Sequence, residues 1–234
     1  MPVEGVVVAG AGLVAIAIAV WWWSRPSAEP PVTRLEPRPA STPPAGPVIT
    51  LEQQIDDLAG AGLKLNPGVC VDDFLTSFSR AEFEGDPYRL LIIMHGFEIE
   101  REPSGRLFSD GAWSFDLECI EGRGSYVRIV NELARLAGGG LVKDVSDEVD
   151  LTQASGSVNY TIAGVRKTLP VEINNDWADT EAARLIMSDI ADAVNDGRRF
   201  FGADNGQALT LFFISDEVAA RVNKLAEGTL LAPV

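Results

Sequence analysis

The stretch 158-VNYTIAGVRKTLPVEI-173 decides the fold class of this chain. Apolar side chains alternate with polar ones on both sides of Ala163-Gly164, and they are Val158, Tyr160, Ile162, Leu169, Val171 and Ile173. A period of two indicates strands, and a two-residue connection containing Gly is typical of a hairpin. Because the strands of a hairpin are antiparallel, the interleaved helices and strands favour an α+β fold with a mixed or antiparallel sheet over a doubly wound one.

Several helices are expected to pack against this sheet. Capping residues and helical spacing predict helices over about 50–60, from Asn66 to about Phe78, over 125–137, from Asp176 or Asp179 to about Asn195, and from Ser215 to Leu225. Further strands are expected at 113–119 and 209–214, and the apolar run 90–94 fits either a strand or a helix. Residues 48–234 are therefore predicted to form one globular α+β domain.

An apolar segment near the start of the chain predicts one N-terminal transmembrane helix. Residues 5–23 contain no charged side chain and end in Trp21, Trp22 and Trp23. At about 1.5 Å per residue a helix of this length crosses a bilayer, and tryptophan prefers the membrane interface. The short tail 1–4 has no Lys or Arg, and bulky residues follow the apolar run, which favours a retained anchor over a cleaved signal peptide.

The segment after the anchor predicts both a linker and an orientation. Eight of the fourteen prolines fall between Arg25 and Pro47, so residues 24–47 are predicted to be an extended linker. Arginine occurs after the anchor, at Arg25, Arg34 and Arg38, and not before it. The positive-inside rule then predicts a single-pass protein of the bacterial inner (plasma) membrane with its C-terminal domain in the cytoplasm.

The charge of the chain narrows the choice of partner. The first 47 residues carry three Arg and three Glu, so the formal charge of −15 falls on residues 48–234. Nucleic acid and anionic headgroups would be repelled by this domain. We therefore expect a protein partner, one of basic charge being favoured, in addition to the lipid bilayer that holds the N-terminal helix.

The densest acidic cluster is Asp116, Glu118 and Glu121. Residues two apart on a strand share a face, so Asp116 and Glu118 are weak candidates for sharing a divalent ion or a proton. The ordinary alternative is a solvated strand face, and we predict neither a metal site nor a cofactor. His95, the only histidine, is expected to be structural.

A second polar stretch surrounds one aromatic residue. Asp176, Trp177 and Asp179 extend the acidic cluster into a candidate binding surface, although Trp177 also fits a residue that packs at a helix entry.

The chain contains no nucleophile elbow, phosphate loop or HExxH motif, so no catalytic residue is predicted and an enzyme is less favoured. Cys70 and Cys119 lie in apolar contexts typical of small buried residues, with a disulfide left open.

Four stretches carry a resemblance to a known group of proteins. The sequences 83-FEGDPYRLL-91, 113-WSFDLECIE-121, 124-GSYVRI-129 and 176-DWAD-179 resemble a family of uncharacterised bacterial proteins, over roughly residues 50–230. The resemblance implies a bacterial source and a discrete domain. It implies no activity, so no catalytic residue is carried over, and it leaves room for a structural role of Asp116 and Glu118.

These patterns together lead to one functional expectation and one alternative. We expect a membrane-tethered domain that binds another protein, either by neutralising a toxin as immunity proteins do or by recruiting a cytoplasmic partner. The alternative is a divalent-metal-dependent enzyme that uses the Asp116, Glu118 and Glu121 carboxylates on a small substrate.

Overall fold

Two antiparallel sheets organise residues 48–205 and 208–234, which are the residues that the computed structural model describes. The central sheet has the strand order β1-β6-β5-β7, and the outer sheet has the order β2-β3-β4. The strands are β1 Ala112–Asp116, β2 Val142–Asp150, β3 Ser155–Ile162, β4 Val165–Glu172, β5 Arg198–Asp204, β6 Ala208–Ser215 and β7 Ala232–Pro233. Every pair of neighbouring strands is antiparallel, and the predicted hairpin is β3-β4, with Ile162 opposite Val165.

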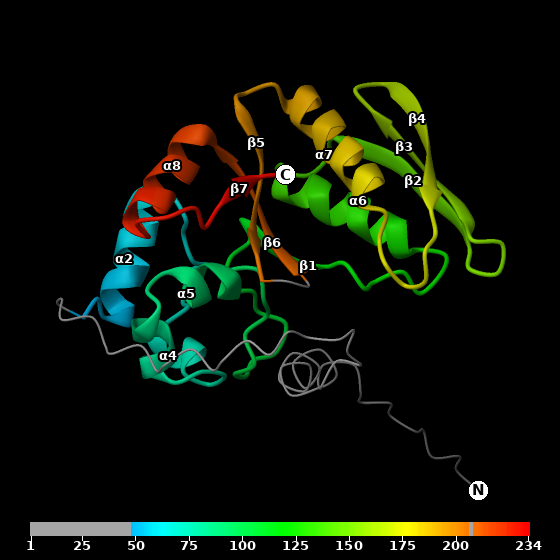
Figure 1. Ribbon diagram of the computed structural model, residues 1–234. Coiled ribbons are helices and arrows are strands. Elements are labelled where there is room, and N and C mark those ends of the chain that lie inside the picture. The colour runs from blue at the N-terminus through cyan, green and yellow to red at the C-terminus, as the bar shows by residue number, and fades with distance from the viewer. Residues whose placement is uncertain (1–47, 206–207) are drawn as a thin grey trace, which may run out of the picture. The chain divides into compact units, whose positions relative to one another are not determined.

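Helices cover both faces of the central sheet. They are α2 Leu51–Ala61, α3 Val71–Phe74, α4 Arg80–Gly85, α5 Arg89–Met94, α6 Ser125–Leu136, α7 Thr180–Val194 and α8 Asp216–Leu225. In Figure 1, α2, α4, α5 and α8 lie on one side of the central sheet, and α6 and α7 lie between it and the outer sheet. The α+β prediction is thus confirmed, with two antiparallel sheets in place of one.

The predicted tail, transmembrane anchor and linker lie outside the described residues. This includes Trp21, Trp22 and Trp23 and the whole of residues 1–47. Among the helices that the structure describes, none combines the length and the apolar character needed to cross a membrane.

Two hydrophobic cores lie on the two faces of the central sheet. Neighbouring residues of one strand point to opposite faces, so Phe200 enters the core that contains α6, α7 and the outer sheet, while Phe201 enters the core of α2, α5 and α8. Phe213 and Phe212 divide in the same way. The central strands are buried on both faces, which explains why 209–214 is a nearly continuous apolar run.

Local capping confirms three of the predicted helix starts. Thr50 forms a capping box with Gln53, and the side chains of Asp179 and Ser215 accept from Ala182 N and Val218 N. Side-chain oxygens thereby satisfy backbone N–H groups that a first turn leaves without a partner.

The helix predicted from Asn66 to Phe78 is wrong in its extent, because only α3 forms. The amide of Asn66 instead binds the chain at 107–110, donating to Leu107 O at 3.1 Å and accepting from Asp110 N at 3.0 Å. The buried run 90–94 is part of the helix α5. Strands β2 and β5 were not predicted, since β2 carries acidic residues at three of its last four positions and β5 begins with two arginines.

The strand predicted over 113–119 ends early, at Asp116. The carboxylate of Asp116 accepts from the backbone N–H of Glu118 at 2.9 Å, a local bond that competes with strand pairing. The prediction that Asp116 and Glu118 share a strand face therefore fails.

The two cysteines differ in burial. Cys70 is exposed, contrary to the prediction, while Cys119 is partly buried, and both are free thiols.

The stretch 83-FEGDPYRLL-91 connects α4 and α5 to α2. The buried Gln54 side chain donates to Phe83 O at 3.0 Å and accepts from Tyr88 N at 2.9 Å. The Tyr88 hydroxyl donates to Asp57 at 2.8 Å, and burial together with this carboxylate raises the pKa of Tyr88 to about 12. These contacts give this stretch a structural role.

Candidate functional site

Two segments far apart in the sequence pair beyond the end of β1. Ile120 N donates to Asp176 O at 2.9 Å, and Ala178 N donates to Leu117 O at 2.7 Å. Between these two hydrogen bonds, Glu118 and Trp177 form an isolated antiparallel bridge. The structure thus places the stretches 113–121 and 176–179, which both supplied candidate binding residues, next to each other.

Four of the six candidate binding residues gather at this pairing, and we call Asp116, Glu118, Asp176 and Trp177 the acidic surface. Trp177 keeps 40% of its side chain exposed and is the one aromatic residue among the exposed large hydrophobic residues that the structure describes. Trp177 lies two residues before Asp179, the N-cap of α7, so it is partly covered at the helix entry and partly open to contact. The neighbouring Ala178 is buried.

The carboxylates of the acidic surface influence one another electrostatically. Burial raises the pKa of the Glu118 carboxyl, and the negative charges of Asp176 and Asp116 raise it further. A hydrogen bond from the Trp177 side chain opposes the shift. Like charges at short range disfavour ionisation, so an added positive charge would stabilise this group of side chains.

Within the described part of the chain, no Lys or Arg forms an ion pair with Asp116, Glu118 or Asp176. Elsewhere many carboxylates do have such partners: Asp73 pairs with Arg106 at 3.2 Å, and Asp189 pairs with Lys167 at 3.1 Å. The three carboxylates of the acidic surface are therefore not neutralised by a neighbouring Lys or Arg of the described chain.

The other two candidate residues serve different purposes. Asp179 caps α7 and also accepts from Glu172 N at 2.8 Å, so both of its carboxylate oxygens are engaged. Glu121 is exposed near the start of α6, and its backbone N–H donates to Ser125. The negative charge of Glu121 also helps to raise the pKa of Cys119 to about 11, although burial is the main cause and Asp116 the next. The Cys119 thiol is therefore a poor nucleophile at neutral pH.

An open hollow of about 510 Å³ adjoins the acidic surface. It is lined by Ile120, Leu151, Ala154, Ile173, Asn174, Asn175 and Asp176. Ile120 and Ile173 are buried, whereas Leu151, in the β2-β3 turn, is 50% exposed. The sequence named Asp176 among these residues as a candidate, whereas it did not indicate Leu151 or Ala154. The only signal was one leucine in a short connection of polar and small residues.

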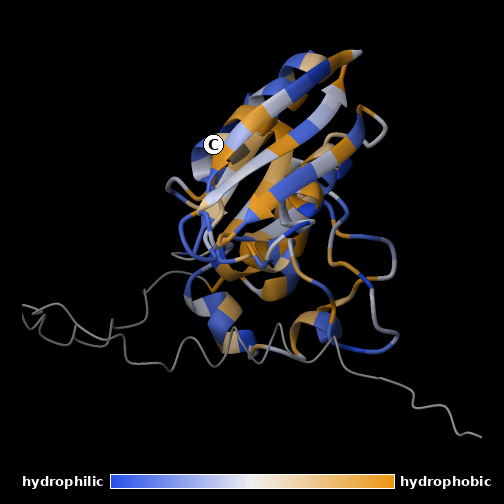
Figure 2. Cartoon of the chain, turned by 90° about the vertical axis from the view of Figure 1, so that its right-hand side faces the viewer, coloured by the Kyte–Doolittle hydropathy of each residue, from blue (hydrophilic) through white to orange (hydrophobic). Residues whose placement is uncertain are grey.

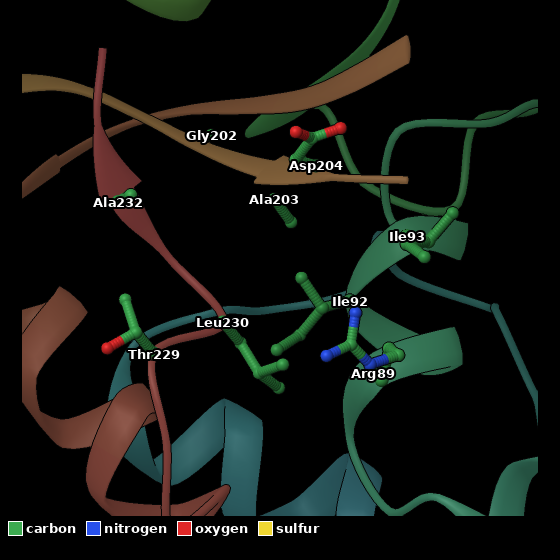
Figure 3. A pocket seen from close by; sticks show the side chains of 9 residues that line it. All are labelled: Arg89, Ile92, Ile93, Gly202, Ala203, Asp204, Thr229, Leu230 and Ala232. Carbon is green, nitrogen blue, oxygen red and sulfur yellow. The ribbon is translucent and has the colours of Figure 1, made fainter. Parts of the chain in front are cut away.

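A smaller cavity of about 120 Å³ lies between α5, β5 and the C-terminal segment. Figure 3 shows the guanidinium of Arg89 beside Ile92, and Asp204 across β5 from Ala203. Arg89 is paired with Asp86 at 3.2 Å. The cavity is smaller than the roughly 300–1,000 Å³ of typical ligand pockets, and its lining holds no nucleophile beside a base.

Metal-ligand chemistry is sparse in this domain. In residues 48–205 and 208–234, no three His, Cys, Asp or Glu side chains are grouped as metal ligands would be. His95 is buried against Leu91 and Phe212, which belong to the core of α2, α5 and α8. The arrangement at the acidic surface therefore offers charge and an aromatic face for binding.

Comparisons with protein-family models, curated proteins and solved structures found no match to this chain. The resemblance to a family of uncharacterised bacterial proteins therefore stays a prediction, and the acidic surface has to be interpreted from its own geometry.

Proposed function

We propose that this chain is a membrane-tethered protein-binding domain whose contact site is the acidic surface. The observation that carries the proposal is the convergence of three carboxylates without ion pairs on an exposed tryptophan. Charge of one sign steers an oppositely charged protein and favours its docking, and aromatic residues dominate the energy of many interfaces. The partner is accordingly a protein with a basic contact face.

The N-terminal sequence suggests where this binding takes place. An anchor at 5–23 and a linker at 24–47 would hold the domain close to a bacterial inner membrane while leaving it free to meet its partner, with the domain in the cytoplasm. Masking a basic toxin, as immunity proteins do, or recruiting a cytoplasmic protein to the membrane both fit this arrangement.

Affinity capture with the full chain in detergent micelles tests the proposal. The site variant is Asp116→Asn/Glu118→Gln/Asp176→Asn. The control variant, Asp56→Asn/Glu98→Gln/Asp192→Asn, removes the same charge at positions of α2, α7 and the segment after α5. We expect wild type and control to retain the same basic protein at low salt, the site variant to lose it, and capture to weaken as salt rises.

Equal capture by both triple variants would show that only the net charge of the domain matters and would refute the acidic surface as the site. Calorimetric titration of the full chain with Mg²⁺, Ca²⁺ and Mn²⁺ tests the alternative function. Saturable heat from any of the three that disappears in the site variant would favour a metal-dependent enzyme over a protein-binding domain.

A further inference from the structure

The hollow beside the acidic surface is an open groove, and the exposed Leu151 is the large apolar side chain that it presents to solvent. Ile120 and Ile173 form buried parts of its lining, at 1% and 5% exposure. Asn174, Asn175 and Asp176 are exposed at its edge, and Leu151 projects from the opposite segment. An aliphatic side chain that entered the hollow would cover the exposed part of Leu151, and this burial of apolar surface favours binding.

The carboxylates and the tryptophan next to the groove favour a partner side chain that is positively charged and can stack on an aromatic ring. Trp177 is the backbone bridge partner of Glu118, so their side chains share one side of the pairing, and the negative charge of Asp176 also acts on Glu118. A guanidinium can stack on an aromatic ring and donate two parallel hydrogen bonds to a carboxylate at the same time. An ammonium is a compact, strongly hydrated charge and lacks this planar geometry. Arginine therefore matches the acidic surface better than lysine does.

The partner segment has to bind through side chains and not by adding a strand at this edge of the outer sheet. Figure 2 looks onto the outer sheet. Strand β4 is one of the two edge strands of this sheet, and it ends at Glu172, directly before the lining residue Ile173. Pro170 lacks the N–H that pairing requires, and Glu172 N already donates to Asp179 at 2.8 Å. These two features protect the edge of β4 from another strand.

We propose that the groove binds an extended segment of the partner in which an aliphatic side chain occupies the hollow and a neighbouring arginine stacks on Trp177 and pairs with Glu118 and Asp176. This proposal rests on the proposed function and adds the chemistry of the recognised segment. Charge complementarity and the exposed Leu151 side chain together select the occupant.

Fluorescence anisotropy with labelled peptides tests it on the full chain in detergent micelles. The probes are GRLRLRG, its lysine analogue GKLKLKG and its serine analogue GRSRSRG. We expect GRLRLRG to bind about tenfold more tightly than either analogue. Leu151→Ser and Trp177→Ala should each weaken its binding about tenfold. Leu185→Ser provides the matched control, because Leu185 on α7 is comparably exposed at 41%, and its binding should equal that of wild type.

Equal affinity for the three peptides, or equal effects of Leu151→Ser and Leu185→Ser, would overturn the proposal. Amide hydrogen exchange of the wild-type chain provides a second readout that needs no variant. GRLRLRG should protect segments 117–121 and 173–178, and protection elsewhere only would also overturn it. If selectivity fails while the site variant still loses the captured protein, the proposed function survives and only the arginine–aliphatic recognition is refuted.

Discussion

His95 shows at the scale of one residue how burial selects a charge state. Its Nδ1 lies 2.8 Å from Leu91 O, so this nitrogen carries the proton, and Nε2 is buried without a hydrogen-bond partner among the described residues. Burial lowers the pKa of His95. The carbonyl oxygens of Leu91 and Leu63 oppose the shift, the latter electrostatically and without the geometry of a hydrogen bond. The folded protein therefore favours neutral His95.

This charge state makes stability depend on pH in a defined direction. The unfolded chain binds the proton near pH 6.5, and the folded chain binds it only at lower pH, so the unfolded state holds more protons between these values. The stabilisation is complete above about pH 6.5 and is lost as the pH falls below it. We expect urea unfolding of wild type to show a fall in the free energy of unfolding from about pH 7.5 to about pH 5.

His95→Asn isolates this contribution, because its amide can donate to Leu91 O as Nδ1 does. The variant should be less stable at neutral pH but lose less stability on acidification. Since His95 is the only histidine, the difference between the two curves belongs to this residue. Parallel curves would contradict the assignment.

At the scale of elements, the N-terminus of α6 is capped by a residue from another part of the chain. Gly124 occupies the N-cap and has no side chain to accept a hydrogen bond. The buried Asp147 of β2 does so instead: its carboxylate accepts from Gly124 N at 2.7 Å, Tyr126 N at 2.9 Å and Val127 N at 3.2 Å. A carboxylate at a helix N-terminus also interacts favourably with the helix dipole.

Asp147→Ala should therefore be strongly destabilising, because it leaves three N–H groups at the helix start without their acceptor. We expect a loss of about 3 kcal/mol in the free energy of unfolding, measured by urea denaturation. The neighbouring Glu148→Ala should stay within about 0.5 kcal/mol, since the ion pair that Glu148 forms with Arg123 in the described chain is exposed. Similar losses for both variants would show that Asp147 does not cap α6.

Helices were predicted correctly where the interactions that define them come from neighbouring residues in the sequence. Helices α2, α7 and α8 were predictable because Thr50, Asp179 and Ser215 cap them from the adjacent residue. The helix from Asn66 was overpredicted because its first residue binds a loop more than 40 positions away. Propensity and spacing cannot register such distant partners.

At the scale of the whole molecule, the proposed tether would limit where the charged domain can bind. All of the net charge of −15 resides in residues 48–234, and the predicted anchor would confine that charge to a layer near the membrane. Confinement raises the effective concentration of the domain toward any partner at the same surface. The proposed orientation decides which partners those are.

Reporter fusions after Val234 test this orientation in bacterial cells. A phosphatase that matures only outside the cytoplasm should be inactive there, and a green fluorescent reporter that matures in the cytoplasm should fluoresce in the membrane fraction. Reversing the charge of Arg25, Arg34 and Arg38 should reduce this preference, because the proposed orientation rests on these arginines. An active phosphatase on the wild-type chain would place the domain outside the cytoplasm.

The amino-acid sequence alone was enough for the α+β class, the β3-β4 hairpin and the locally capped helices, because periodicity and adjacent caps are short-range properties. It also named Asp116, Glu118, Asp176 and Trp177 as candidate residues. Only the tertiary structure decided that segments 117–120 and 176–178 pair, that Asp147 caps α6 and that Leu151 lies beside Ile173. These features depend on strand order and on contacts between distant residues, which no local pattern encodes.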